Sequence, residues 1–135
     1  MVVSLATHHS RFNAMAKHMV HWADEVLSPS AGKICPRSTW TPSVNLYEDG
    51  DGYYVVAELA GVDSDEMELR VEKTVLVLSG HRDTPQPEGP INVHLMEIDH
   101  GNFCRTLKLP LDADSSAIEA TFRNGLLWVR IPKKA

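Results

Sequence analysis

The chain has 135 residues, of which 43% are hydrophobic and 23% are charged, a composition typical of one globular domain with a real core. The net charge is −5 and it is uneven, because the first 43 residues carry +2 and the remainder carries −7. An acidic body argues against a nucleic-acid surface, which needs clustered cations.

The sequence also argues against a membrane or secreted protein. No apolar stretch reaches the length that spans a bilayer, and the N-terminus lacks the basic region and sustained apolar segment of a signal peptide. Cys35 and Cys104, the only cysteines, lie far apart in sequence and make neither a disulfide framework nor a zinc site alone. We therefore expect a cytoplasmic protein in a reducing compartment, without a membrane span.

Residues 1–41 are predicted to form an N-terminal arm. A helix is expected over about 11–27, with Ser10 as its N-cap, because apolar residues recur there at three- and four-residue spacing. This stripe contains Phe12, Met15, Ala16, Met19, Trp22, Ala23 and Val26. The stretch 28–42 is rich in Pro, Ser and Gly and is typical of a linker.

Residues 42–135 are predicted to form an immunoglobulin-like antiparallel β-sandwich of seven or eight strands. Short apolar or alternating runs separated by turn residues are typical of such a fold. The expected strands cover 44–48, 53–59, 67–72, 75–80, 91–98, 103–110, 117–122 and 126–132. Asp49–Gly52 is expected to make a tight turn, and the three prolines within His81–Pro90 exclude a regular strand there.

The last two strands are predicted to form a hairpin. Asn124 and Gly125 suit a two-residue turn in which both residues have positive φ. Leu127, Val129 and Ile131 alternate with the residues of the other face and are expected to point into the sandwich.

Residues 42–133 resemble the α-crystallin domain of the small heat-shock proteins. Three segments carry the resemblance in the expected order: "AELAGVDSDEMELRVE", "GNFCRTLKLP" and "AIEATFRNGLLWVRIPK". The last contains an Asn-Gly-x-Leu turn and an Ile-Pro-Lys ending. Only two residues follow Lys133, so we expect almost no C-terminal extension and no Ile-x-Ile/Val tail motif.

The resemblance implies an ATP-independent chaperone, a holdase that binds partly unfolded client proteins and prevents their aggregation. It implies no cofactor and no enzymatic activity. The expected client-binding residues are the adaptable apolar side chains of the arm, Phe12, Met15, Met19 and Trp22. The alternative is that this stripe docks on its own body or on a dimer partner. A related sandwich, the CS-type cochaperone domain, is the alternative for the whole chain.

Two further surfaces follow from the resemblance. A groove between two edge strands is expected to accept an extended segment, although each of its residues could equally be plain core. Its residues are Met67, Leu69, Val71, Ile118, Ala120 and Phe122. A homodimer by strand exchange is also expected, and the arm could join such dimers into larger oligomers. The interface residues are Ile91, Val93 and Leu95, with Arg105 making structural contacts nearby.

Enzyme and metal sites find little support. No phosphate-binding loop or nucleophile elbow is present. His18 and His21 lie three apart near His8 and His9, but no carboxylate or cysteine completes a metal site at a convincing spacing. Cys104 is expected to be a small core or interface residue, whereas Cys35, in the linker, could be redox-sensitive.

Overall fold

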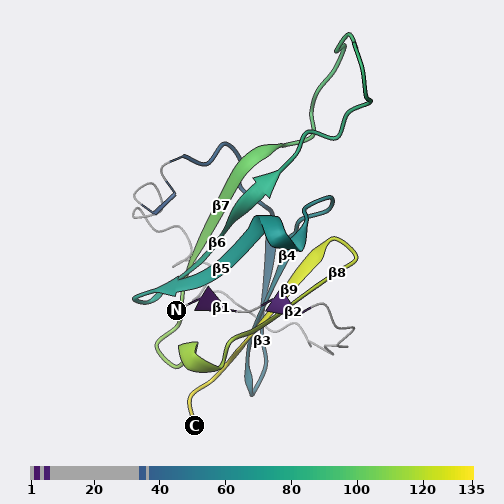
Figure 1. The fold of residues 1–135 in the computed structure, drawn as a ribbon. Helices are drawn as coiled ribbons and strands as arrows, with labels where there is room; N and C mark the ends of the chain where they lie inside the picture. Colours follow the sequence, from purple (N-terminus) through teal and green to yellow (C-terminus); the bar gives the residue numbers. More distant parts are fainter. Residues whose placement is uncertain (1, 4, 7–33, 36) are drawn as a thin grey trace.

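The structure is a computed structural model that describes residues 2–3, 5–6, 34–35 and 37–135. Two sheets face each other as a sandwich (Figure 1). Sheet A has the strand order β1-β5-β6-β7, and sheet B has the order β2-β8-β9-β4-β3. The strands of sheet A are β1 (Val2–Val3), β5 (Met67–Glu72), β6 (Val75–Arg82) and β7 (Gly101–Lys108). Those of sheet B are β2 (Leu5–Ala6), β3 (Val44–Glu48), β4 (Gly52–Glu58), β8 (Glu119–Arg123) and β9 (Leu126–Pro132).

The predicted immunoglobulin-like β-sandwich is confirmed, and its core follows the predicted alternation. In β5 every second residue is buried, and in β9 Leu127, Val129 and Ile131 are buried between half-buried neighbours. This pattern arises because successive side chains of a strand point to opposite faces of the sheet. Two short 3-10 helices, η1 (Ser64–Glu66) and η2 (Ser115–Ala117), precede β5 and β8. Each is capped by an aspartate side chain that accepts a hydrogen bond from a backbone amide.

The turns take the conformations that their residues favour. Asn124 (φ 50°) and Gly125 (φ 75°) both lie in the left-handed region, and β8 pairs antiparallel with β9 across them. This is the predicted two-residue hairpin. At the β3–β4 turn, Asp49 Oδ1 accepts hydrogen bonds from the amides of Asp51 and Gly52 at 2.8 and 2.9 Å.

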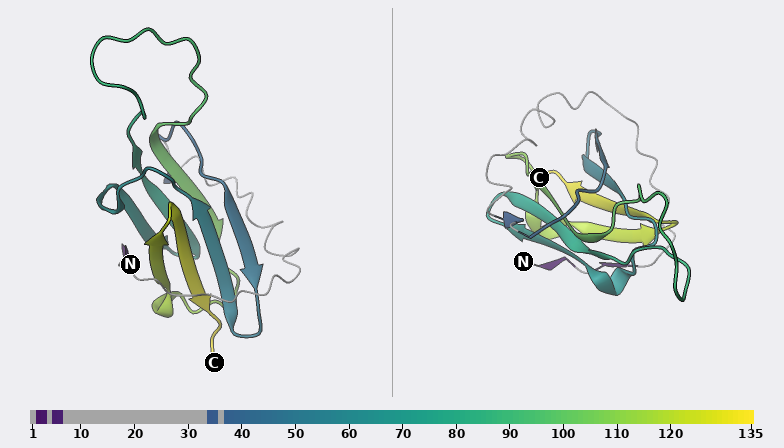
Figure 2. Two further views of the ribbon diagram at one scale, coloured as in Figure 1. Left: turned by 90° about the vertical axis from the view of Figure 1, so that its right-hand side faces the viewer. Right: turned by 90° about the horizontal axis from the view of Figure 1, so that it is seen from above.

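One predicted strand is absent from the described structure. The segment 91–98 lies in a long loop, residues 83–100, that extends away from one end of the sandwich (Figure 2). The prediction of a strand there is wrong for this chain alone, because a strand needs a neighbour to satisfy its backbone groups. The proline-rich loop also begins later than expected, since β6 continues through His81 and Arg82.

Two short strands at the N-terminus were not predicted. β1 pairs antiparallel with β5, and β2 pairs parallel with β8. Residues 2–6 thus reach an edge strand of each sheet, which brings the two ends of the sequence to the same sandwich. The helix expected over 11–27 lies outside the described residues.

Candidate functional sites at the sheet edges and the long loop

The first candidate site is the pair of edge strands β5 and β8, one in each sheet. Val2 and Val3 are in register with Arg70 and Leu69 of β5. Leu5 and Ala6 are in register with Ala120 and Thr121 of β8. An edge strand presents unpaired amides and carbonyls that accept another strand. This part of the sandwich therefore receives an extended segment from another region of the chain.

The side chains predicted to line a groove here belong to the core between the sheets. Those of Met67, Leu69, Val71, Ile118 and Ala120 are buried, and Phe122 packs against the same cluster. The structure thus brings the six residues into one apolar cluster. The segment that pairs at these edges does so through the backbone of β5 and β8.

The second candidate site is the loop 83–100, whose apolar side chains are exposed. Leu95 is 77% exposed, Val93 57% and Ile91 41%. Met96 and Ile98 are exposed as well, and the loop curls around a hollow of about 460 Å³. A group of apolar residues open to water is a candidate interaction surface.

Arg82 anchors the end of this loop, and the sequence reasoning did not single it out. Its side chain is only 8% exposed, and its guanidinium donates hydrogen bonds to the carbonyls of Asp99 and Ala60. The guanidinium also lies 4.2 Å from the centre of the Trp40 ring. A charged residue at the end of a strand, immediately before a proline-rich loop, is the signal that could have identified it.

His81 lies beside Arg82 at the start of the loop. Its Nδ1 is 3.0 Å from Asn102 Oδ1 and its Nε2 is 3.1 Å from Asp83 Oδ1. The hydrogen bond to Asn102 raises the pKa of the imidazole above its usual value. Burial acts in the opposite direction, and the bond and charge of Asp83 add to the rise. When the ring is protonated, both of its nitrogens donate, one to Asn102 and one to Asp83, and these residues lie at the two ends of the loop.

Arg105 lies in β7, and its half-buried side chain donates from Nη1 to the Pro42 carbonyl at 3.4 Å. Pro42 precedes β3, the last strand of sheet B. In the described part of the chain β3 has a neighbour on one side only, β4. Its outer edge is thus a second place where a strand could add.

Polar groups close the far end of sheet B. The Tyr53 hydroxyl donates to Asp112 Oδ1 at 2.6 Å, and Lys133 Nζ donates to Glu48 Oε2 at 2.8 Å. Burial, together with the bond to Asp112, raises the pKa of the tyrosine well above its usual value. The bond to Glu48 raises the pKa of Lys133. The Lys133–Glu48 pair ties the end of β9 to β3, and the Tyr53–Asp112 bond ties β4 to the segment between β7 and η2.

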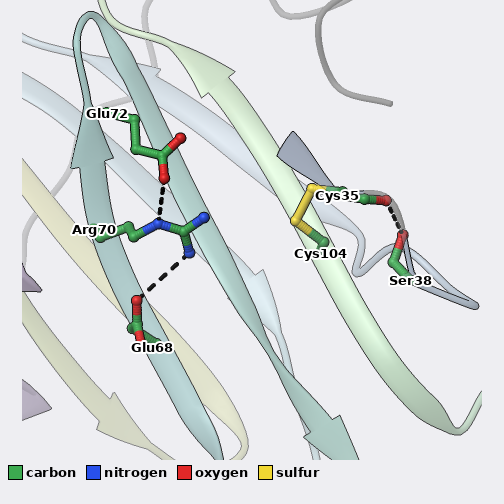
Figure 3. The surroundings of a disulfide bond; sticks show 6 residues. All are labelled: Cys35, Ser38, Glu68, Arg70, Glu72 and Cys104. Carbon is green, nitrogen blue, oxygen red and sulfur yellow. Dashed lines mark hydrogen bonds and ion pairs between the residues drawn. A yellow bond between two sulfur atoms is a disulfide. The ribbon is translucent and has the colours of Figure 1, made fainter. Parts of the chain in front are cut away.

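The two cysteines differ from the sequence expectation. Cys35 and Cys104 form a disulfide, and Cys104 is buried but absent from the core cluster (Figure 3). Distance in sequence is no guide to distance in space, and β7 brings Cys104 beside the linker. The expected client-binding residues Phe12, Met15, Met19 and Trp22 lie outside the described residues, as do His8, His9, His18 and His21.

Within residues 2–3, 5–6, 34–35 and 37–135, no group of three or more His, Cys, Asp or Glu side chains is placed to hold a metal ion. The same residues include no helix of the length and apolarity that crossing a membrane requires.

Known proteins match the same region. The pattern of the Hsp20/alpha crystallin family matches residues 45–135. Small heat shock protein C4 of Rickettsia felis is 30% identical over 94 residues, which are 70% of this chain and 58% of that protein. Heat shock protein 16 of Schizosaccharomyces pombe is 35% identical over 97 residues, 69% of this chain and 66% of that one. The chain thus spans about three fifths of the length of the Rickettsia relative.

A solved structure shows the same fold. The small heat-shock protein from Xylella fastidiosa superposes with a TM-score of 0.66 at 31% identity, covering 73% of this chain and 90% of that one. The family pattern covers more than half of the sequence. The chain therefore belongs to the Hsp20/alpha-crystallin family.

Proposed function

We propose that this protein is an ATP-independent holdase that binds partly unfolded proteins and suppresses their aggregation. Membership of a family of chaperones supports this activity, and a cytoplasmic location is part of the proposal. The observation that carries it is the pairing of residues 2–6 with β5 and β8. Edge strands that accept an extended segment of their own chain have the geometry to accept an extended segment of a client.

Apolar surface supplies the rest of the binding energy. Unfolded clients expose apolar side chains, and covering these side chains removes the drive to self-associate. The arm residues Phe12, Met15, Met19 and Trp22 are the proposed client contacts, because methionine side chains adapt to partners of different shape. Chaperoning of this kind needs no catalytic group.

The test of the holdase is suppression of aggregation without ATP. A heat-labile client is warmed with increasing amounts of the full chain while light scattering is followed, and an inert protein of similar size serves as the control. We expect scattering to fall as the chain approaches equimolar amounts. Unchanged scattering at an excess of the chain would exclude the proposal.

The role of the arm is tested by two matched variants. Met15→Ser combined with Met19→Ser removes two apolar side chains of the stripe. Asn13→Ser combined with Lys17→Ser changes two neighbouring residues outside it. We expect the first pair to need several-fold more protein for the same protection and the second to behave as the original chain. Equal protection by both variants would show that Met15 and Met19 of the arm do not contribute to client binding.

We also propose that the chain forms a homodimer by strand exchange. Ile91, Val93 and Leu95 of the exposed loop would pair with the outer edge of β3 in a second copy, near Arg105. This arrangement gives the loop the neighbour that it needs to become a strand and covers its apolar side chains. Larger assemblies through the arm are compatible with it.

The dimer is tested by the mass in solution of the full chain and two variants. Leu95→Asp places a charge among the exposed apolar residues, and His94→Asp places the same charge at the neighbouring position. We expect dimers for the original chain and His94→Asp, and monomers for Leu95→Asp. A monomeric original chain would exclude the exchange.

A further inference from the structure

The disulfide between Cys35 and Cys104 joins the linker to sheet A. The two residues are 69 positions apart in sequence, and their Cα atoms are 5.7 Å apart, within the usual range for a disulfide. Cys104 is 8% exposed and Cys35 is half-buried. The bond lies on β7, beside the segment that leads into the sandwich (Figure 3).

The bond lies on the outer face of sheet A. Cys104 is in register with Ser79 of β6, and Ser79 with Glu68 of β5. The neighbouring residues Phe103 and Leu78 belong to the core cluster, so Cys104 and Ser79 point the other way. The disulfide therefore contributes nothing to the packing between the two sheets.

Among the described residues of the linker, hydrogen bonds to β7 begin at Thr39. The Thr39 amide donates to the Asn102 carbonyl at 2.8 Å, and Trp40 Nε1 donates to the Gly101 carbonyl at 3.0 Å. For the described residues 34, 35, 37 and 38, the one bond to β7 is the disulfide. Ser38 Oγ donates to the Cys35 carbonyl, which is a contact within the segment itself.

A small thiol can reach the bond. Both cysteines line a hollow of about 500 Å³ on this face, together with Arg37 and Arg70. The carboxylates of Asp65, Glu66 and Glu68 line the same hollow, and Arg70 is ion-paired with Glu68 and Glu72. What a reducing thiol needs here is access to a sulfur of the bond, and the hollow provides it.

We propose that Cys35 and Cys104 form a redox-reactive site that a dithiol reductant opens. A thiolate of the reductant attacks Cys35, the more exposed sulfur, and forms a mixed disulfide while Cys104 leaves as a thiolate and takes up a proton. The second thiol of the reductant then displaces Cys35, which leaves as a thiol. The protein gains two electrons and two protons, and the reductant becomes a cyclic disulfide.

Opening the site moves the last anchor of the linker from Cys35 to Thr39. Residues 34, 35, 37 and 38 leave the outer face of sheet A, whereas the core between the sheets and the contacts of Thr39 and Trp40 remain. The redox state thus sets how closely the linker is held to the sandwich. This inference does not depend on the proposed holdase activity, and its test uses no client.

The test is limited trypsin cleavage of the full chain, oxidised or reduced with dithiothreitol, at the exposed Arg37–Ser38 bond. We expect roughly tenfold faster cleavage after reduction, because protease attack follows local opening. Alkylation should label both cysteines only in the reduced protein. Circular dichroism should show the same β-sheet content in both states.

Three variants control the experiment. Cys35→Ser and Cys104→Ser should be cleaved at the reduced rate with or without dithiothreitol, whereas Ser38→Ala should keep the response. Equal cleavage of oxidised and reduced chains would overturn the proposal, as would a disulfide that links two chains instead of closing within one. Unfolding of the sandwich on reduction would also overturn the proposal, because the disulfide would then be needed to stabilise the fold.

Discussion

Polar side chains at the ends of strands organise the connections of this sandwich. Arg82 ends β6 and binds the carbonyls of Asp99 and Ala60, so one side chain joins the long loop to the turn before η1. Asp49 does the same for the β3–β4 turn through the amides of Asp51 and Gly52. Backbone groups outside regular ladders need such partners when water is excluded.

Arg82→Met removes the hydrogen-bond donors of the guanidinium and replaces the arginine with an apolar side chain of similar length. The carbonyls of Ala60 and Asp99 then lose their donor, so we expect a loss of about 2–3 kcal/mol in the free energy of unfolding, measured with urea. Arg70→Met is the matched control. Arg70 makes ion pairs with Glu68 and Glu72 near the surface, which contribute at most about 1 kcal/mol. Equal costs for the two variants would contradict the anchoring role.

Asp49→Asn tests the charge at the β3–β4 turn. Burial raises the pKa of Asp49, but the amide bonds, the Tyr54 hydroxyl and the charge of Arg130 outweigh it and keep the pKa below its usual value of 3.8. A lowered pKa in the folded state stabilises the protein above the unfolded value, and this contribution disappears as the pH falls through the folded value.

We therefore expect the Asp49→Asn variant to unfold at lower urea than the original chain at pH 7. The difference should shrink as the pH falls below the ordinary carboxyl value. Asp51→Asn provides the comparison. Asp51 contributes its backbone amide to the turn, and this group is unchanged in the variant. A difference between the Asp49→Asn variant and the original chain that is independent of pH would show that the charge of Asp49 has no role.

The packing around β6 requires neighbouring atoms to come close to the backbone of Gly80. Gly80 of β6 lies opposite Met67 and Phe103, its partners in the two neighbouring strands. A Cβ atom at Gly80 would come within 2.6 Å of the Phe103 ring and would also overlap the Glu66 carbonyl. Glycine at this position allows η1 and the Phe103 ring to pack against the strand.

Gly80→Ala is expected to lower the free energy of unfolding by about 1–3 kcal/mol, because the ring and backbone must shift to admit a methyl group. Gly50→Ala is the matched control, since no atom lies within 4 Å of a Cβ at that position. We expect the control to stay within about 0.5 kcal/mol of the original chain in urea unfolding. If the Gly80→Ala variant is as stable as the control, the Phe103 ring and the backbone shift to admit the methyl group without a measurable cost.

At the scale of the whole molecule, β1 and β2 extend the two sheets, because β1 pairs with β5 and β2 pairs with β8. Each of the strands β1 and β2 has two residues, so each pairing rests on few hydrogen bonds. Elements with few bonds open at low free energy. The segment can therefore leave the edges of β5 and β8 without unfolding the sandwich.

Deletion of residues 2–6 is expected to expose the edge amides of β5 and β8. Hydrogen exchange of these strands should become roughly tenfold faster, because the amides lose their cover. The amides of β6, a central strand of sheet A, serve as the internal reference and should not change. Faster exchange in β6 as well would mean that the segment supports the whole fold.

Local features of the sequence determined most of the sandwich. The two-residue alternation of "MELRVE" located β5, and Asn124-Gly125 located the last hairpin, because side-chain period and turn conformation depend on neighbouring residues. The motifs of "AIEATFRNGLLWVRIPK" also identified the family. The six residues expected at the edge strands came from the resemblance to that family, and their role in binding a segment stays a prediction.

Only the tertiary structure decided which distant segments meet. Segment 91–98 has the apolar pattern of a strand but remains a loop, because a strand forms only beside a neighbour. The pairing of residues 2–6 with β5 and β8, the bond between Cys35 and Cys104, and the position of Arg82 between two carbonyls all join residues far apart in sequence. Such contacts depend on how the two sheets pack, and no local pattern specifies that.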